Sequence, residues 1–333
     1  MHPFTLERPR DLSDALARQA QSGRNDIAAE YIAGGTDMVQ LLQENVRRPD
    51  RLVSIGGLTD RRIDVSREGL RIGAGATMAE VAAHPGVVAQ FPVIAQALLE
   101  SASPQVRNQA TMGGNLLQRT RCPYFRDTGY GACNKRIPGS GCAALRGENR
   151  WHAVLGGSDD CIAVHPSDLA VALVALDAVV HIQGSRGERG VALREFHRLP
   201  GSTPHIEAEL RPAEVIAAIT VAAHPAARRS HYLKVRDRAS FEFAVVSAAV
   251  ALEMQDDGRI RQARVAVGGV GTKPWRLPDV ETALAGSSLQ RDALRQAATL
   301  AAQGAQGRGH NDFKIELMQR AIVRAAEAAG ARA

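Results

Sequence analysis

The sequence predicts an α+β fold in two domains, and three observations along its 333 residues support this prediction. Short apolar strands alternate with amphipathic helices over the first third of the chain. A Pro/Gly/Ser-rich passage at 199–204 and a break at His224-Pro225 indicate a boundary before about residue 228. Beyond this boundary two apolar strands precede three helices. We therefore expect a first domain over 1–227 and a separate α+β domain over 228–333.

The elements of the first third follow from apolar periodicity and from capping residues. Residues 28–32 are short, apolar and strand-like, and they end at Gly34-Gly35. Thr36-Asp37 then cap a helical stretch, and a strand at 51–55 closes a βαβ unit. Further along we expect a strand at 69–73, a helix from about Thr77, a helix at 92–100 with its proline in the first turn, and a Gly/Asn-containing loop at 111–115.

The stretch from Arg119 to Cys161 loses this pattern. It contains all four cysteines, several glycines and prolines, and little apolar periodicity. A structureless passage of this length in a compact domain is unusual and is normally functional or disordered. Regular structure is expected to return with a helix that starts near 165–168 and a strand at 178–183.

The second domain begins with two apolar strands, at 245–254 and 260–267. Asp256-Asp257-Gly258 between them is a good hairpin signal. Helices are expected to follow at 278–285, 289–302 and 312–328.

Composition and charge exclude several classes of function. The net charge of +6 is spread among acidic residues rather than gathered into a basic stripe, so no nucleic-acid binding is expected. No apolar run approaches the roughly 18 residues of a membrane span. Residues 1–8 lack a signal-peptide pattern, so the cytoplasm is the default location, with the periplasm open by co-export with a signal-bearing partner. The ten histidines are isolated in the sequence, and we expect them to be structural or surface residues.

The clustering of Cys122, Cys133, Cys142 and Cys161 requires a cause, and three chemistries fit it. Two disulfides would suit a small exported domain, but this chain is large enough to fold without them. A structural zinc usually takes close Cys-x-x-Cys pairs, and the sequence contains none. A [4Fe–4S] cluster takes four thiolates and tolerates wide spacing. The basic residues in this stretch would stabilise a negatively charged cluster, although the spacing alone does not decide between the three.

Two glycine loops are candidates for holding the phosphates of a dinucleotide. The first, at 33–37, lies between a predicted strand and a predicted helix, where glycines allow close backbone approach to a pyrophosphate. The second, at 111–115, adds a hydroxyl and an amide to the backbone donors. Neither loop matches G-x-G-x-x-G or the Walker A pattern, and a single Gly-Gly turn is most often only a turn.

Two charged residues further along have both a structural and a functional interpretation. Asp168 follows Pro166-Ser167 at a helix start, where it would either cap the helix or hydrogen-bond to a cofactor. Lys234 lies in a strand-like run and would either face solvent or stabilise a reduced, anionic flavin ring.

Three segments together resemble the FAD-binding subunits of the xanthine dehydrogenase and aldehyde oxidase family. They are 33–38, 107–116 and 166–168, and the resemblance covers nearly the whole chain in order. It implies a two-subdomain FAD-binding domain of the vanillyl-alcohol-oxidase (PCMH) type over 1–227, split near residue 57. It also implies that 228–333 is the C-terminal α+β domain of the carbon monoxide dehydrogenase flavoprotein type.

The cysteine stretch at 119–161 resembles one subgroup of this family. Residues 118–125, 133–136 and 138–144 are similar to the members that carry an extra [4Fe–4S] cluster, above all to the FAD subunits of bacterial periplasmic aldehyde oxidoreductases. The resemblance therefore implies that Cys122, Cys133, Cys142 and Cys161 ligate such a cluster.

The resemblance also implies a function and a set of partners. A large subunit would hold the molybdenum cofactor and oxidise an aldehyde, and a small subunit would carry two [2Fe–2S] clusters. This chain would pass their electrons through FAD to an external acceptor, with no catalytic side chains of its own. The alternative is a self-sufficient FAD oxidoreductase in which zinc or disulfides hold the cysteine stretch.

The FAD-binding residues are carried over from the family position by position. They are Tyr31, Ile32, Ala33, Gly34, Gly35, Thr36, Asp37, Met38, Ala110, Thr111, Gly113, Gly114, Asn115, Gln118, Asp168 and Lys234.

Overall fold

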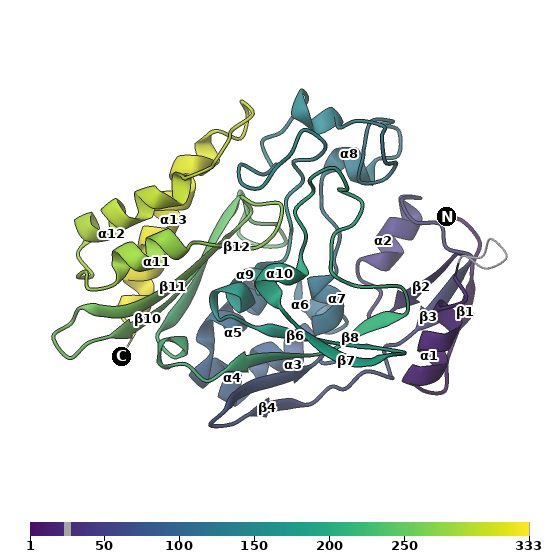
Figure 1. Ribbon diagram of the computed structural model, residues 1–333, viewed down its shortest axis with the longest axis horizontal. Helices are drawn as coiled ribbons and strands as arrows, with labels where there is room; N and C mark the ends of the chain where they lie inside the picture. Colours follow the sequence, from purple (N-terminus) through teal and green to yellow (C-terminus); the bar gives the residue numbers. More distant parts are fainter. Residues whose placement is uncertain (23–27, 333) are drawn as a thin grey trace.

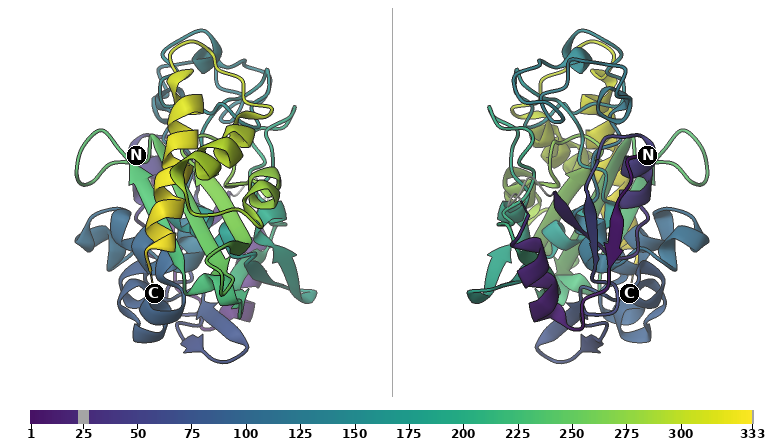
Figure 2. Two further views of the ribbon diagram at one scale, coloured as in Figure 1. Left: turned by 90° about the vertical axis from the view of Figure 1, so that its left-hand side faces the viewer. Right: turned by 90° about the vertical axis from the view of Figure 1, so that its right-hand side faces the viewer.

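The computed structural model describes residues 1–22 and 28–332, and its first layer is a small parallel sheet with strand order β1-β3-β2. Strands β2 and β3 run parallel with α2 between them, which confirms the predicted βαβ unit. Figure 2 shows α1 packed against this sheet, around a core of Ala15, Ala29 and Val53. The elements are β1 (Thr5–Glu7), α1 (Leu12–Gln19), β2 (Ala29–Ile32), α2 (Met38–Gln43) and β3 (Arg51–Ser54).

The second layer is an antiparallel five-stranded sheet with strand order β4-β5-β8-β6-β7. The predicted strand at 69–73 and the predicted helix at 92–100 are confirmed as β5 and α5. The strands are β4 (Ile63–Val65), β5 (Gly69–Gly73), β6 (Val179–Gly184), β7 (Gly187–Ala192) and β8 (Glu214–Ala222). The helices are α3 (Met78–Ala83), α4 (Pro85–Gln90), α5 (Pro92–Glu100), α6 (Pro104–Arg107), α7 (Met112–Leu116), α9 (Asp168–Ala175) and α10 (Leu193–Phe196).

Capping explains where several of these helices begin. Thr77 and Glu80 form a reciprocal capping box at the start of α3, as the predicted helix start near Thr77 requires. The predicted loop at 111–115 is wrong, because the hydroxyl of Thr111 accepts a hydrogen bond from the N–H of Gly114 and starts the short helix α7.

The third layer is the four-stranded antiparallel sheet β12-β11-β10-β9. The hairpin predicted around residues 256–258 is confirmed by the pairing of β10 with β11. Figure 1 shows α11, α12 and α13 on one side of this sheet, and α5 and α9 contact it from the five-stranded sheet's side. The elements are β9 (Ser230–Val235), β10 (Val246–Met254), β11 (Ile260–Gly268), β12 (Trp275–Arg276), α11 (Pro278–Leu284), α12 (Arg291–Ala298) and α13 (Phe313–Gly330). The helix expected over 289–302 is α12 followed by a 3₁₀ turn at Thr299–Ala302.

The cysteine stretch is irregular, as predicted, and it lies at the top of Figure 1 between the two domains. Its only regular elements among the described residues are α8 (Pro123–Arg126) and a 3₁₀ turn at Ala143–Leu145. Val154 and Leu155 both donate backbone hydrogen bonds to the carbonyl of Val270, and both are buried in the core of the C-terminal sheet. The stretch is therefore packed against the second domain.

Each of the two predicted domain divisions falls between two sheets. The first sheet ends at Ser54 and the second begins at Ile63, while β9 of the third sheet begins at Ser230. The domain limits at 57 and 228 stay predictions. No helix in the part of the chain that the structure describes is long and apolar enough to cross a membrane.

Candidate cofactor site

One cavity of about 820 Å³ lies where the glycine loops, the cysteine stretch and the second domain meet. This volume falls within the usual range of about 300–1,000 Å³ for ligand pockets. Every residue predicted to bind FAD lines it: Tyr31, Ile32, Ala33, Gly34, Gly35, Thr36, Asp37, Met38, Ala110, Thr111, Gly113, Gly114, Asn115, Gln118, Asp168 and Lys234. The fold thus brings residues from four separate parts of the sequence to one cavity.

The first glycine loop packs backbone against backbone. A Cβ on Gly34 would lie 1.9 Å from the carbonyl oxygen of Gln109, so no other residue fits there. Gly35 has φ +74°, a left-handed conformation that favours glycine. Gly34 is therefore needed to place the two loops in contact at the cavity wall, and Gly35 is needed for the backbone conformation of the first loop.

The second loop is fixed by main-chain bonds to the start of α3. The N–H of Met78 donates to the carbonyl of Ala110 (2.9 Å), and the N–H of Met112 donates to the carbonyl of Ala76 (2.9 Å). Asn115 is held as well, because its amide oxygen accepts from the hydroxyl of Ser167 (2.6 Å). A Cβ on Gly114 would meet Oγ1 of Thr111 at 3.0 Å, so this glycine leaves room at the cavity surface.

Asp168 and Lys234 form a buried ion pair at the wall of the cavity. The Nζ of Lys234 lies 2.8 Å from Oδ2 of Asp168, and the two side chains are 1% and 6% exposed. Asp168 also accepts from the hydroxyls of Tyr232 (2.6 Å) and Ser101 (2.9 Å). The alternative that Lys234 lies on a solvated strand face is therefore wrong. Capping by Asp168 is also wrong, because Ser167 caps α9.

Asp37 connects the first glycine loop to the cysteine stretch. Its Oδ1 accepts from Arg121 (2.6 Å) and Arg126 (2.8 Å), and its Oδ2 accepts from the backbone N–H of Arg119 (2.8 Å). Burial alone would raise the pKa of Asp37, but the two guanidinium groups outweigh it and the pKa lies below its usual value. The carboxylate is thus held ionised and turned toward the arginines.

Two histidines that were expected to be structural or surface residues line the same cavity. The rings of His165 and His197 lie 4.2 Å apart, and Nε2 of His197 bonds to the carbonyl of Leu116 (2.9 Å). Burial lowers the pKa of His197 to about 4 and that of His165 well below its usual value, so both rings are neutral. Among the described residues, Nε2 of His165 and Nδ1 of His197 have no hydrogen-bond partner.

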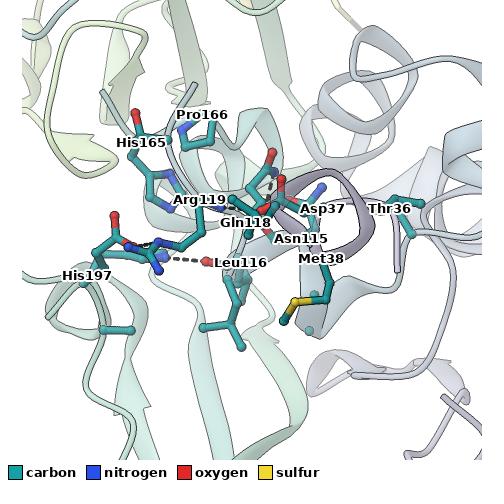
Figure 3. A pocket seen from close by; sticks show the side chains of 18 of the residues that line it. Thr36, Asp37, Met38, Asn115, Leu116, Gln118, Arg119, His165, Pro166 and His197 are labelled. Carbon is teal, nitrogen blue, oxygen red and sulfur yellow. Dashed lines mark hydrogen bonds and ion pairs between the residues drawn. The ribbon is translucent and has the colours of Figure 1, made fainter. Parts of the chain in front are cut away.

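Figure 3 shows His165 and His197 on one side of the cavity and Thr36 and Met38 on the other, with Asn115 between them. The unpartnered ring nitrogens are the kind of buried polar atoms that a polar ligand would satisfy. Isolated histidines in a sequence have no signal that marks such a position, because the pairing depends on two segments 32 residues apart.

A second, small cavity is lined by all four cysteines. The four thiols are free, and Cys133 and Cys142 face each other across an isolated β-bridge. Burial and the neighbouring thiols raise the pKa of Cys122 to about 12 and that of Cys161 to about 11. Thiols this buried are protonated at neutral pH unless a positively charged centre binds them.

The basic residues of the cysteine stretch bind other groups of the protein. Arg121 and Arg126 bond to Asp37, and Arg136 donates to the carbonyls of Tyr124 and Phe125, each at 2.8 Å. Lys135 forms a partly buried ion pair with Glu207 (2.6 Å). These basic side chains hold the cysteine stretch in place around the cavity that the thiols line.

The two cavities share a wall. Lys135, Cys161 and Ala163 line both of them. Cys161 would therefore border a ligand in the larger cavity as well as the space between the four thiols.

Whether side chains could bind a metal ion depends on their positions in the fold. Over residues 1–22 and 28–332, no three His, Cys, Asp or Glu side chains come together so that they could hold a metal ion. The four cysteines line one small cavity.

Comparisons with known proteins agree with this geometry. Residues 2–223 match the family described as the FAD binding domain in molybdopterin dehydrogenase, and residues 231–329 match the carbon monoxide dehydrogenase flavoprotein C-terminal domain. The chain is 44% identical to the aldehyde oxidoreductase FAD-binding subunit PaoB of Escherichia coli (strain K12), over 97% of each chain.

More distant relatives share the same fold. The chain is 25% identical to the carbon monoxide dehydrogenase medium chain of Afipia carboxidovorans, over 99% of this chain and 98% of the relative. A chain in the crystal structure of the cyanide-inactivated Cu,Mo-CO dehydrogenase superposes with a TM-score of 0.76 at 24% identity, over 100% of both chains. That likeness concerns the fold alone.

Proposed function

The chain belongs to the xanthine dehydrogenase and carbon monoxide dehydrogenase family of FAD-binding subunits, and from this premise we propose that it is the electron-transfer medium subunit of a molybdenum-containing aldehyde oxidoreductase. Its partners are a large subunit with the molybdenum cofactor and a small subunit with [2Fe–2S] clusters. The observation that carries the proposal is the convergence of both glycine loops, Asp168 and Lys234 on one cavity.

The fit of FAD to this cavity rests on the backbone. Gly34 lets the two loops pack together, and Gly114 leaves the second loop without a side chain at the cavity surface, because a Cβ there would meet only Oγ1 of Thr111. Backbone N–H groups and the hydroxyls of Thr36 and Thr111 are suitable donors for a diphosphate. The unpartnered nitrogens of His165 and His197 offer further polar contacts.

Lys234 and Asp168 place charged groups at the wall of the cavity. When bound, FAD supplies a centre that exchanges electrons singly or in pairs. Lys234 is held by Asp168 and by the carbonyl of Glu100 (3.0 Å), so its ammonium group stays at the cavity wall. A fixed buried cation there favours a ligand with greater electron density.

A [4Fe–4S] cluster on the four cysteines is the second part of the proposal. In a tetrahedral zinc site with Zn–S of about 2.3 Å, the sulfurs lie about 3.8 Å apart, and no described trio of ligands is placed to hold one ion. A cubane cluster binds its four thiolates at four different irons, which suits four cysteines that line one cavity.

The cysteine cavity must open to admit a cluster, because its volume of about 10 Å³ is no more than that of a water site. The stretch that carries the thiols has little regular structure, since its described residues form only α8 and one 3₁₀ turn as regular elements. The disulfide form of the alternative function finds no support, because all four thiols are free.

Aldehyde oxidation is proposed because the relative at 44% identity is named an aldehyde oxidoreductase subunit. The aldehyde itself would bind to the molybdenum subunit. This chain would receive the electrons, and the shared wall at Cys161 supports exchange between the cluster and FAD.

The test is an analysis of cofactors in the complex purified under anaerobic conditions, with flavin, iron, sulfide and zinc quantified on the same sample. We expect one FAD and four irons from this chain, in addition to the irons of the small subunit. Stoichiometric flavin with zinc and without the four additional irons would support the self-sufficient alternative. Absence of flavin would overturn the proposal.

A further inference from the structure

His152 lies directly against one of the four cysteines. Its Nε2 is 3.1 Å from Sγ of Cys122, and the residue is only 2% exposed. The sequence separates the two residues by 30 positions, and the histidine is not adjacent to any cysteine in the chain.

The backbone of His152 is held in place by the second domain. The carbonyl of His152 accepts hydrogen bonds from Nζ of Lys314 (3.1 Å) and from Nδ2 of Asn311 (3.4 Å), at the start of α13. Its own N–H donates to the carbonyl of Asn149 (2.9 Å), and its ring packs beside that of Tyr124. The backbone at His152 is thus attached to residues at the start of α13, which helps to place the ring beside Cys122.

The chemistry of the contact fixes the direction of the hydrogen bond. A thiolate sulfur only accepts, and a neutral imidazole carries one N–H. An imidazole donates through an N–H in either protonation state, so the ring nitrogen that contacts the thiolate must carry the hydrogen. Among the described residues, Nδ1 of His152 has no hydrogen-bond partner. The hydrogen bond to the Cys122 sulfur is therefore donated by Nε2.

We propose that His152 is a positioning residue that donates its Nε2–H to the Cys122 thiolate and raises the reduction potential of the cluster. This inference rests on the proposed function, because it requires a cluster on the four cysteines. A reduced cluster carries one more negative charge than an oxidised one, so its sulfurs accept a stronger hydrogen bond. The donor therefore stabilises the reduced state more than the oxidised state.

A second sulfur of the site receives a similar but weaker contact. The backbone N–H of Ala163 points to Sγ of Cys161 at 3.4 Å. Because this donor is main chain, no side-chain substitution removes it. His152 is the donor that mutation can test.

The test is a redox titration of the intact complex, followed by electron paramagnetic resonance of the reduced cluster. We compare the wild type with His152→Phe, which keeps a ring but has no donor, and with His152→Gln, which keeps an N–H donor. The matched control is His310→Phe, since His310 is exposed and contacts Glu148.

We expect His152→Phe to keep its iron and to shift the cluster's potential to a more negative value. His152→Gln should recover part of this shift, and His310→Phe should show none. A His152→Phe variant with full iron content and the wild-type potential would overturn the inference, while a wild type without the additional irons would overturn the proposed cluster itself.

Should His152→Phe fail to take up iron, the wild type still decides the question. Pulsed electron paramagnetic resonance of the reduced cluster, in protein with ¹⁵N-labelled histidine, should show a weak coupling to one imidazole nitrogen. Absence of that coupling would contradict the hydrogen bond.

Discussion

Gly34 lies in the first glycine loop of the cavity and Gly114 in the second. An added side chain would meet different atoms at the two positions. At Gly34 a Cβ would lie 1.9 Å from a backbone carbonyl oxygen, whereas at Gly114 it would meet the hydroxyl oxygen of Thr111 at 3.0 Å. The first glycine is needed for folding and the second for the room that a ligand uses. Substitution separates these two roles.

We expect Gly114→Val to fold. Its FAD content should be at least about tenfold lower than that of the wild type, because the added methyl groups occupy the cavity surface. Gly34→Val should yield little folded protein, since a backbone carbonyl cannot move aside. Flavin content and circular dichroism measure the two effects. Gly57→Val is the control, because a Cβ there meets no atom within 4 Å and Gly57 does not line the cavity. Full FAD occupancy in Gly114→Val would contradict the assignment.

The cysteines also differ residue by residue. Cys122 lines only the small cavity, while Cys161 lines both cavities. The two thiols are thus equivalent as proposed ligands of a cluster but unequal as neighbours of FAD.

Cys122→Ala should therefore lose the additional iron and retain FAD with an unchanged flavin spectrum. Cys161→Ala should lose the iron and also shift the flavin absorption bands, because a wall of the cofactor cavity changes. Iron analysis and absorbance spectra of the purified complex check both expectations. Loss of FAD together with iron in Cys122→Ala would show that the two sites do not load independently.

At the scale of elements, the start of α2 is tied to the cysteine stretch through one carboxylate. Asp37 accepts from Arg121, Arg126 and the N–H of Arg119, and Arg126 also reaches Glu44 at the end of α2 (3.2 Å). The Asp37 and Arg126 side chains are 16% and 10% exposed, so loss of one partner leaves buried charge without compensation.

Asp37→Ala should lower the free energy of unfolding by about 3 kcal/mol, as expected when one member of a buried ion pair is removed. Urea unfolding of the isolated chain measures the change. Asp64→Ala, on an exposed position of β4, should stay within about 0.5 kcal/mol of wild type. Equal effects of the two substitutions would mean that the Asp37 network contributes no stability.

At the scale of the whole molecule, the cysteine stretch joins the first sheet to the second domain. Its start is bound to α2 by ion pairs, and residues 149–156 are docked on the C-terminal sheet and on α13. The cofactor cavity lies between these attachments, so its shape depends on both domains and on the buried histidines in its wall.

Those histidines make global stability depend on pH. Burial lowers the pKa of His197 from 6.5 to about 4, so between these values the unfolded chain binds a proton that the folded chain does not. The free energy of unfolding of the FAD-free chain should therefore fall as pH decreases from about 6.5 to about 4, by on the order of 3 kcal/mol for this residue.

Urea unfolding at several pH values between 4 and 8 measures this dependence. His197→Phe should flatten the curve, whereas His310→Phe should leave it unchanged because His310 is exposed. A His197→Phe curve as steep as that of wild type would assign the dependence to other groups.

The sequence by itself determined the features that neighbouring residues encode. The βαβ unit, the hairpin at 256–258, the start of α3 at Thr77 and the irregular cysteine stretch all follow from short patterns of apolar, capping and turn residues. The strand β8 was not predicted. Its nearly continuous apolar run lacks the alternation of apolar and polar residues that distinguishes a strand from a buried helix.

Only the tertiary structure decided which distant residues meet. The burial of Lys234 against Asp168, the turn of Asp37 toward Arg126 and the contact of His152 with Cys122 join residues that are 66, 89 and 30 positions apart. No local pattern specifies such pairs, because they arise when packed sheets bring separate segments to one place. The sequence thus indicated the glycine loops and the cysteines as candidates for the site, while the packing of the sheets determined what each residue contacts and which histidines join them.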